Sequence, residues 1–206
     1  MSENPNDEVW IDQFKKVGKS ASLWQQSARH LVCAANVLYH RELRIPREAG
    51  IAPSGIFIAL MLYGLALENL LKGLLVARGL EATSTGHLSR KLRHHRLRLL
   101  CQETGIDISS DEADLLEELQ RLIESAKYPF GVHPRLGKAR RGIIVPTDFK
   151  LTFALIDRVE ETLREAAPDR TLERIDLRSL CVDDEGTAQR TQRSRQSGLR
   201  PRPHPN

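Results

Sequence analysis

Apolar residues recur at intervals of three and four over five stretches of this chain, the spacing that places them on one face of an α-helix. The stretches cover residues 10 to 40, 55 to 78, 87 to 103, 109 to 126 and 148 to 166. No stretch shows the alternation of apolar and polar residues that is typical of a β-strand. The pattern therefore predicts an all-α fold, a bundle of packed helices.

The second stretch is apolar on almost every side as far as Glu68, and a helix of that kind lies in the middle of a bundle. Its longest apolar run is twelve residues, 56 to 67, whereas a membrane span needs about 18 or more. We therefore expect a buried core helix rather than a membrane helix. The residues expected to be buried in it include Leu60, Tyr63, Leu67, Leu71 and Leu74.

Local signals mark the ends of these helices. Ser54 is placed to cap the second helix and Gly79 to end it, because glycine readily adopts the left-handed conformation of a helix C-terminus. Ser109 and Glu112 have the spacing of a capping box, in which each side chain accepts a hydrogen bond from the other residue's backbone amide. Thr147 is placed to cap the last helix.

Two segments are predicted not to belong to the helices. Residues 127 to 146 contain three prolines and three glycines, and a loop of this length in a compact domain is usually either functional or mobile. The chain after residue 183 is polar and rich in arginine and proline, with nothing to bury. We therefore assign residues 8–167 to the helical bundle and residues 168–206 to an extension that ends in a disordered basic tail.

Charge is unevenly distributed along the chain. Residues 187 to 206 hold five arginines and no acid, a charge of +5. The net charge of the whole chain is +4, so the residues before this tail carry −1. Residues 89 to 98 hold five lysines or arginines and no acid, and residues 127 to 150 hold six against one acid. Eight acids lie between them, in residues 103 to 124. Such blocks either steer a polyanion to one face or are ordinary solvated helix faces, and both interpretations stay open.

The cysteines and the N-terminus indicate a reducing compartment. The first ten residues lack the basic and apolar regions of a signal peptide. The three cysteines are odd in number and far apart, which favours the cytoplasm over a disulfide framework or a zinc site. His87, Arg90 and His94 share one face of the predicted third helix, but no acid or cysteine accompanies them. We therefore predict a cytoplasmic protein with no metal and no cofactor.

Four segments in a fixed order carry a resemblance to a known family. They are Trp24 with the pair Ala34 and Ala35; ALENLLKGLLVARG at residues 66 to 79; GHLSRKL from Gly86; and LLEELQRLIESAKYPF, which ends in Lys127, Tyr128, Pro129 and Phe130. In this order they resemble the HEPN superfamily, in the bacterial branch whose fourth helix ends in an Arg-Tyr-Pro signature. The resemblance covers roughly residues 10 to 166.

The resemblance implies a four- to five-helix up-and-down bundle that forms a homodimer. Many HEPN proteins are metal-independent ribonucleases of toxin–antitoxin or phage-defence systems, and others bind RNA or nucleotides without cleaving them. It therefore implies a protein that acts on or binds RNA, with an antitoxin or another operon product as partner and no membrane. Whether the chain is an enzyme stays open; if it is, the resemblance implies a metal-independent endoribonuclease. The alternative is a non-catalytic helical dimerisation, adaptor or nucleotide-binding module.

The family's catalytic motif is an arginine and a histidine separated by four to six residues, near the start of the last core helix. At the matching place this chain has Lys127 and His133, so we predict His133 as the base and Lys127 or Arg135 as the cation on the phosphate. The residues predicted to bind substrate are Tyr128, Arg140, Arg141 and Arg90. The alternative is that Lys127 merely ends its helix and His133 is an exposed loop residue.

A literal match to the motif also occurs at Arg90 and His95. If residues 87 to 103 form one continuous helix, two residues five positions apart are turned by about 140° and do not converge. The sequence therefore favours the 127–133 pair over this one.

Glu68 and Lys72 are spaced as an i,i+4 ion pair with the acid first, which is the favourable order on a helix. Because their helix is otherwise apolar, we expect the pair to be at least partly buried. Together with Asn69 they are predicted to form a structural polar cluster in the bundle core. The alternative is that they form one wall of a ligand cleft.

Overall fold

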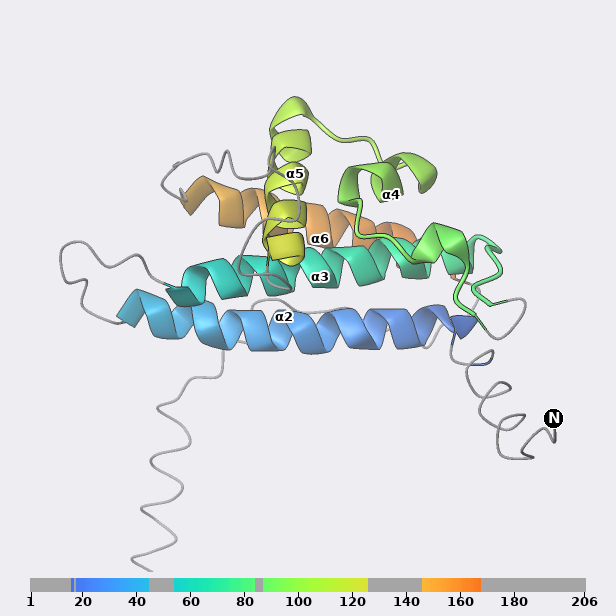
Figure 1. Ribbon diagram of the computed structural model, residues 1–206, viewed down its shortest axis with the longest axis horizontal. Helices are drawn as coiled ribbons and strands as arrows, with labels where there is room; N and C mark the ends of the chain where they lie inside the picture. The colour runs from blue at the N-terminus through green and yellow to red at the C-terminus, as the bar shows by residue number, and fades with distance from the viewer. Residues whose placement is uncertain (1–15, 17, 45–53, 84–86, 126–145, 168–206) are drawn as a thin grey trace, which may run out of the picture.

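The structure, a computed structural model, describes residues 16, 18–44, 54–83, 87–125 and 146–167 (Figure 1). Within these residues the chain forms five α-helices and one 3-10 helix, η1, and no β-strand; an isolated bridge joins Thr83 to Leu88. The elements are α2 (Ala21–Arg44), α3 (Ser54–Ala77), η1 (Arg90–Leu92), α4 (Leu97–Glu103), α5 (Ser110–Ser125) and α6 (Pro146–Ala166). The predicted all-α fold is confirmed.

Helix α3 is the centre of the bundle, because α2, α4, α5 and α6 all pack against it. Every residue predicted for its core is 2% exposed or less: Leu60, Tyr63, Leu67, Leu71 and Leu74. The segment Gly55–Ala77 is long and apolar enough to cross a membrane, but 72% of its most apolar window is buried inside the bundle. Such burial fits the core helix of a soluble protein, where the neighbouring helices cover the apolar surface.

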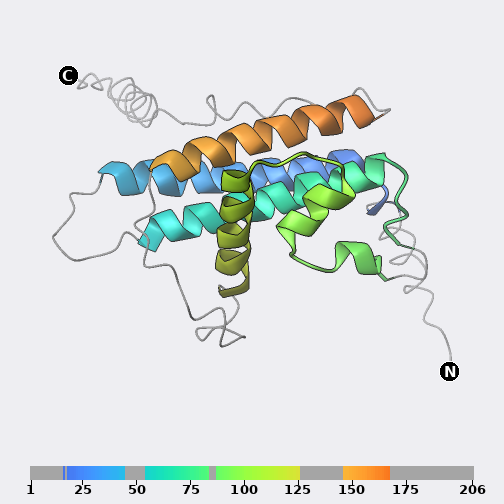
Figure 2. The ribbon, with the colours of Figure 1, turned by 90° about the horizontal axis from the view of Figure 1, so that it is seen from above.

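The long helices run side by side and α5 crosses them. Figure 1 shows α2 and α3 packed in opposite directions. Helix α2 is also antiparallel to α6: Gln25 Nε2 donates to Glu160 Oε1 at 2.9 Å near one end, and the rings of Tyr39 and Phe149 lie 4.3 Å apart near the other. Helix α6 therefore runs in the same direction as α3. Figures 1 and 2 both show α5 crossing α3 at a steep angle.

The crossing of α3 by α5 depends on a glycine. A Cβ added at Gly64 would lie 3.2 Å from Leu119 Cβ and 3.2 Å from Ile123 Cδ1, which is tighter than ordinary contact. Leu119 and Ile123 are both buried, as are Leu115 and Leu116 on the same face of α5. Helix α5 covers α3 near Gly64. Further along the same side of α3 lie η1, α4 and the loop between them (Figure 1).

Helix α3 ends where the sequence predicts. Gly79 has a φ of 92°, and its amide donates to Val76 O at 2.9 Å. The amide of Leu80 donates to Leu75 O, also at 2.9 Å. These are the two hydrogen bonds of a Schellman motif, which satisfies the last carbonyl groups of a helix.

Some boundaries differ from the prediction. Lys19 and Ser20 are not helical, so the first predicted helix is interrupted and α2 begins at Ala21. Helix α2 then continues to Arg44, beyond the predicted end at residue 40. Helix α6 begins at Pro146, before the predicted cap at Thr147. Proline fits a first helical turn, since the amide that it lacks would have no partner within the helix.

The prediction of one continuous helix over residues 87 to 103 is wrong. Residues 90–92 form a short 3-10 helix, residues 93–96 are not helical, and α4 begins at Leu97. Arg96 has φ −81° and ψ 86°, outside the helical region. The cause is tertiary, because the side chain of His95, inside this break, hydrogen-bonds to Glu68 on α3.

Other predicted segments lie outside the described residues. The long loop falls there apart from its last residue, Pro146, as does the 168–206 extension with its basic tail. The division at residue 167 therefore stays a prediction.

The capping box at the start of α5 is confirmed. The Glu112 amide donates to Ser109 Oγ at 3.2 Å, and the Ser109 amide donates to Glu112 Oε2 at 2.9 Å. Arg158 of α6 adds an ion pair to Glu112 Oε1 at 2.9 Å. Burial alone would raise the pKa of Glu112, but the hydrogen bonds from Ser109 and Arg158 outweigh it and lower this pKa. The cap therefore joins α5 to α6 through one carboxylate.

We predict that Ser109→Ala lowers the free energy of unfolding by about 1 kcal/mol, because the Glu112 amide loses its acceptor. Urea unfolding at pH 7 measures this loss. Ser110→Ala, at an exposed neighbouring position, is the control and should change stability little. Equal unfolding midpoints for Ser109→Ala and Ser110→Ala would contradict the role of the cap.

The stabilisation from Glu112 should also depend on pH. Its folded-state pKa lies below the ordinary value of 4.5, so the carboxylate stabilises the fold above pH 4.5 and less as pH falls through the folded pKa. Glu112→Gln should therefore be destabilising at pH 7 and progressively less so under acid conditions. A penalty that does not vary with pH would argue against an ionised cap.

Candidate functional site

Two charged side chains are buried on α3. Glu68 and Lys72 are 4% and 5% exposed, and Lys72 Nζ lies 2.5 Å from Glu68 Oε1. The predicted ion pair is therefore present. It was expected to be at least partly buried, and both side chains are almost fully buried. Asn69 is partly exposed, and among the described residues no hydrogen bond joins it to either charged side chain. The buried cluster on α3 is thus an ion pair whose remaining partner comes from elsewhere in the chain.

That partner is His95, which lies 27 residues beyond Glu68 in the sequence. Its Nδ1 is 2.8 Å from Glu68 Oε2. A carboxylate can only accept, so Nδ1 carries the proton and Nε2 of the neutral ring has the lone pair. The His95 side chain is 31% exposed, so the ring extends from the buried carboxylate to the surface. A carboxylate that orients an imidazole in this way is the usual support of a general base.

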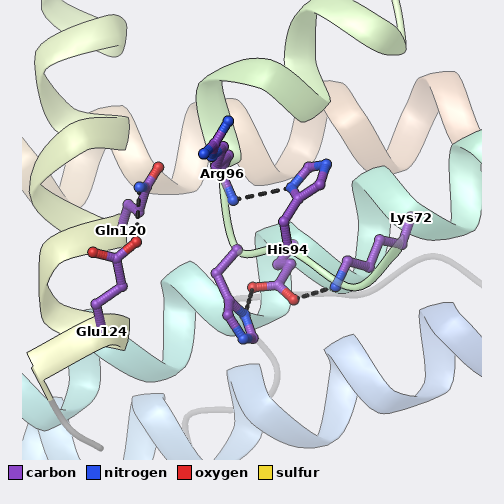
Figure 3. Close-up of polar contacts among 7 residues, drawn as sticks. Lys72, His94, Arg96, Gln120 and Glu124 are labelled. Atoms are coloured by element: carbon purple, nitrogen blue, oxygen red, sulfur yellow. Dashed lines mark hydrogen bonds and ion pairs between the residues drawn. The ribbon is translucent and has the colours of Figure 1, made fainter. Parts of the chain in front are cut away.

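His94 lies beside this contact with its proton placed differently. The backbone amide of Arg96 donates to His94 Nδ1 at 3.2 Å, so Nε2 of the neutral ring carries the proton. Burial lowers the pKa of His94; Glu103 opposes this shift, and the positive charges of Lys72 and Arg96 reinforce it. His94 is therefore neutral at pH 7. Figure 3 shows Lys72 reaching from α3 toward the loop that carries His94 and Arg96.

Residues 89–98, which we call the basic segment, present their cations to solvent. Leu92 and Leu97 are buried and fix the segment to the core. All five basic side chains of the segment are exposed: Arg90, Lys91, Arg93, Arg96 and Arg98. The apolar residues of the segment thus point inward, and its exposed cations lie in the same segment as the two histidines. This arrangement can hold an anion next to a proton acceptor.

The predicted site residues are only partly covered by the described chain. Arg90 is the first residue of η1 and belongs to the basic segment. Six residues lie outside the described part, and their roles stay predictions: Lys127, Tyr128, His133, Arg135, Arg140 and Arg141.

Sequence reasoning did not identify His95 as a site residue. One objection to the match between Arg90 and His95 was their divergence on a continuous helix, and it does not hold because residues 93–96 are not helical. The spacing match carries little information, since roughly two such matches are expected by chance in this composition. The remaining signal was a charged residue, Glu68, on an otherwise apolar helix. What the sequence does not contain is the contact between the two segments.

The residues that the structure describes contain no candidate metal cluster, and the thiol of Cys101 is buried. In the part of the chain that the structure describes, no group of three or more His, Cys, Asp or Glu side chains could hold a metal ion. Cys101 is buried, and burial raises its pKa to about 11, so its thiol stays protonated and unreactive at neutral pH. Histidine is the side chain whose charge ordinarily changes near neutral pH, and two histidines lie in this site.

No family model, curated protein or solved structure matches this chain. Function is therefore inferred from the geometry of its residues and from the resemblance of its motifs.

We predict that Glu68→Ala lowers the free energy of unfolding by about 3 kcal/mol, because it leaves the buried Lys72 ammonium without its carboxylate. The double variant Glu68→Leu/Lys72→Leu removes both charges and should regain most of that stability. Denaturant unfolding of the two variants measures the difference. A double variant as unstable as Glu68→Ala would show that the loss comes from packing and not from an unpaired charge.

Proposed function

We propose that this chain is a HEPN-type protein that binds RNA and cleaves it without a metal ion, with His95 as the general base. The observation that carries the proposal is the 2.8 Å contact between the buried Glu68 carboxylate and His95 Nδ1, inside an exposed basic segment. A polyanion attracted to that segment meets an oriented imidazole. The order of motifs that resembles the HEPN superfamily supports the same function.

The proposed reaction uses groups that this site provides. His95 Nε2 takes the proton of a ribose 2′-hydroxyl, and the resulting oxygen attacks the adjacent phosphorus. The bond to the 5′-oxygen breaks, a 2′,3′-cyclic phosphate forms, and the leaving oxygen takes a proton from solvent. Glu68 stabilises the imidazolium that forms at His95. Exposed cations of the basic segment such as Arg90 neutralise the phosphate oxygens.

The family resemblance offers a second assignment of the same chemistry. It makes His133 the base and Lys127 or Arg135 the cation, all outside the described residues. The two assignments differ in which histidine is essential, so single substitutions separate them. We also propose a cytoplasmic location, which the cysteine usage supports. The family resemblance supports a homodimer with an antitoxin or another operon product as partner.

We predict that His95→Ala slows cleavage of a labelled single-stranded RNA by roughly 100- to 10,000-fold, the usual range for loss of a general base. The helical circular dichroism should be retained, since the ring is partly exposed. EDTA should have no effect on the wild-type rate. His87→Ala, which removes an exposed histidine, is the matched control and should cleave like wild type.

Three results would change this assignment. Full activity of His95→Ala together with an inactive His133→Ala would move the base to the 127–146 loop. Loss of activity in EDTA would contradict metal-independent cleavage. Wild-type protein that binds RNA at micromolar concentration but cleaves none would favour the non-catalytic binding or adaptor function.

A further inference from the structure

A groove of about 420 Å³ lies between α4 and α5, next to the basic segment. Three arginines line it, Arg96, Arg98 and Arg121, against one acid, Glu117. Its remaining lining consists of Leu99, Gln102 and Gln120. The volume falls within the range of small-molecule sites, roughly 300–1,000 Å³. The groove is thus large enough for a ligand and carries an excess of positive charge.

The arginines of the groove can accept an anion. In the part of the chain that the structure describes, the Arg96 guanidinium forms no ion pair. Arg98 pairs with Glu117 at 2.9 Å, and this pair is solvent-exposed. Arg121 pairs with Glu118 one turn away on α5, and this pair is half-buried; pairs at this helical spacing contribute only weakly to stability. Exposed ion pairs contribute little stability and are screened by water, so a phosphate can replace the carboxylates at small cost. Guanidinium groups bind phosphate through two parallel hydrogen bonds.

The other lining residues suit a planar heterocycle. Leu99 is apolar and partly buried, which provides a surface for the face of a ring. Side-chain amides both donate and accept, so Gln102 and Gln120 can pair with the polar edge of a nucleobase. Gln120 Nε2 is held by Glu124 Oε1 at 2.9 Å, which orients this amide. The groove therefore combines contacts for a phosphate with contacts for a base.

The groove adjoins the histidines of the candidate site. Arg96 lines the groove, follows His95 directly in the chain, and donates its amide to His94 Nδ1. Figure 3 shows Arg96 between His94 on one side and Gln120 of α5 on the other. A strand whose reacting phosphate lies at the histidines would thus place a neighbouring nucleotide in the groove.

We propose that this groove binds one nucleotide, with its phosphate on Arg96 and Arg121 and its base between Leu99 and the two glutamines. The assignment rests on the proposed function for its place beside the reacting phosphate. The nucleotide is either a free nucleoside monophosphate or one unit of a single-stranded RNA. Both present the same chemistry to the groove, and the probes below separate them.

The test uses the full chain and two probes that cannot be cleaved. One is a ribonucleoside 5′-monophosphate, and the other is a short 2′-O-methyl oligoribonucleotide, which lacks the attacking hydroxyl. Calorimetry or NMR titration measures the Kd of each. Arg96→Gln/Arg121→Gln should weaken binding by roughly tenfold or more, as expected when charge-assisted hydrogen bonds are lost. It should also flatten the salt dependence of oligonucleotide binding by about 1.4 in log–log slope.

A matched control comes from α6. Arg164 forms an i,i+3 pair with Glu161 and is 28% exposed, like Arg121, which pairs with Glu118 at the same spacing and is 27% exposed. Arg164 does not line the groove, so Arg164→Gln should leave both Kd values unchanged. An equal loss of binding in Arg164→Gln would show that general charge and not the groove binds the probes, and would overturn the proposal.

The remaining outcomes are also decisive. A mononucleotide that binds as tightly as the oligonucleotide supports a free nucleotide as ligand, and much tighter oligonucleotide binding supports an RNA subsite. Inorganic phosphate that binds as tightly as the mononucleotide overturns the base contacts. Cleavage by His95→Ala and mononucleotide binding by Arg96→Gln/Arg121→Gln are separate measurements, so failure of the proposed cleavage and failure of groove binding are distinguishable. Absence of saturable binding of both probes would overturn the nucleotide site even if RNA is cleaved.

Discussion

The buried carboxylate of Glu68 is the constraint on which the arrangement of this protein depends. It is buried on α3, the helix against which α2, α4, α5 and α6 all pack, and an unpaired charge there would be strongly destabilising. Lys72 satisfies one oxygen from the same helix, and His95 satisfies the other from a distant segment. Residues 93–96 are not helical, and the His95 ring in this break reaches the Glu68 carboxylate. The basic segment contains this break and exposes all five of its cations, so the oriented imidazole and the cations lie in one stretch of chain.

Much of the fold could be predicted from the sequence because its signals are local. The apolar pattern of α3, the glycine at its end and the box of Ser109 with Glu112 each act within a few residues. The break at residues 93–96 could not be predicted in this way. It follows from a contact with a residue 27 positions earlier, and nothing within the segment itself, such as proline or glycine, marks it.

The candidate site was predictable to a similar extent. The spacing of Glu68 and Lys72 on an apolar helix indicates a buried pair, and the structure places it in the core. The role of His95 depends on the shape of its segment, and a continuous helix would have turned it away from Arg90. The residues predicted from the family resemblance, around His133, remain predictions. An oriented imidazole, a neutral neighbouring histidine and a cationic groove lie within a few residues of one another, which is why we link RNA cleavage to nucleotide binding.

The central claim is that Glu68 holds His95 by its Nδ1, and the tautomer of that ring tests it most directly. Nitrogen-15 NMR of labelled histidines at a pH where His95 is neutral distinguishes a protonated Nδ1 from a protonated Nε2. The account predicts the proton on Nδ1 in wild type and its loss from that position in Glu68→Leu/Lys72→Leu, where no carboxylate accepts it. A wild-type His95 with its proton on Nε2, or a tautomer indifferent to the removal of Glu68, would contradict the account.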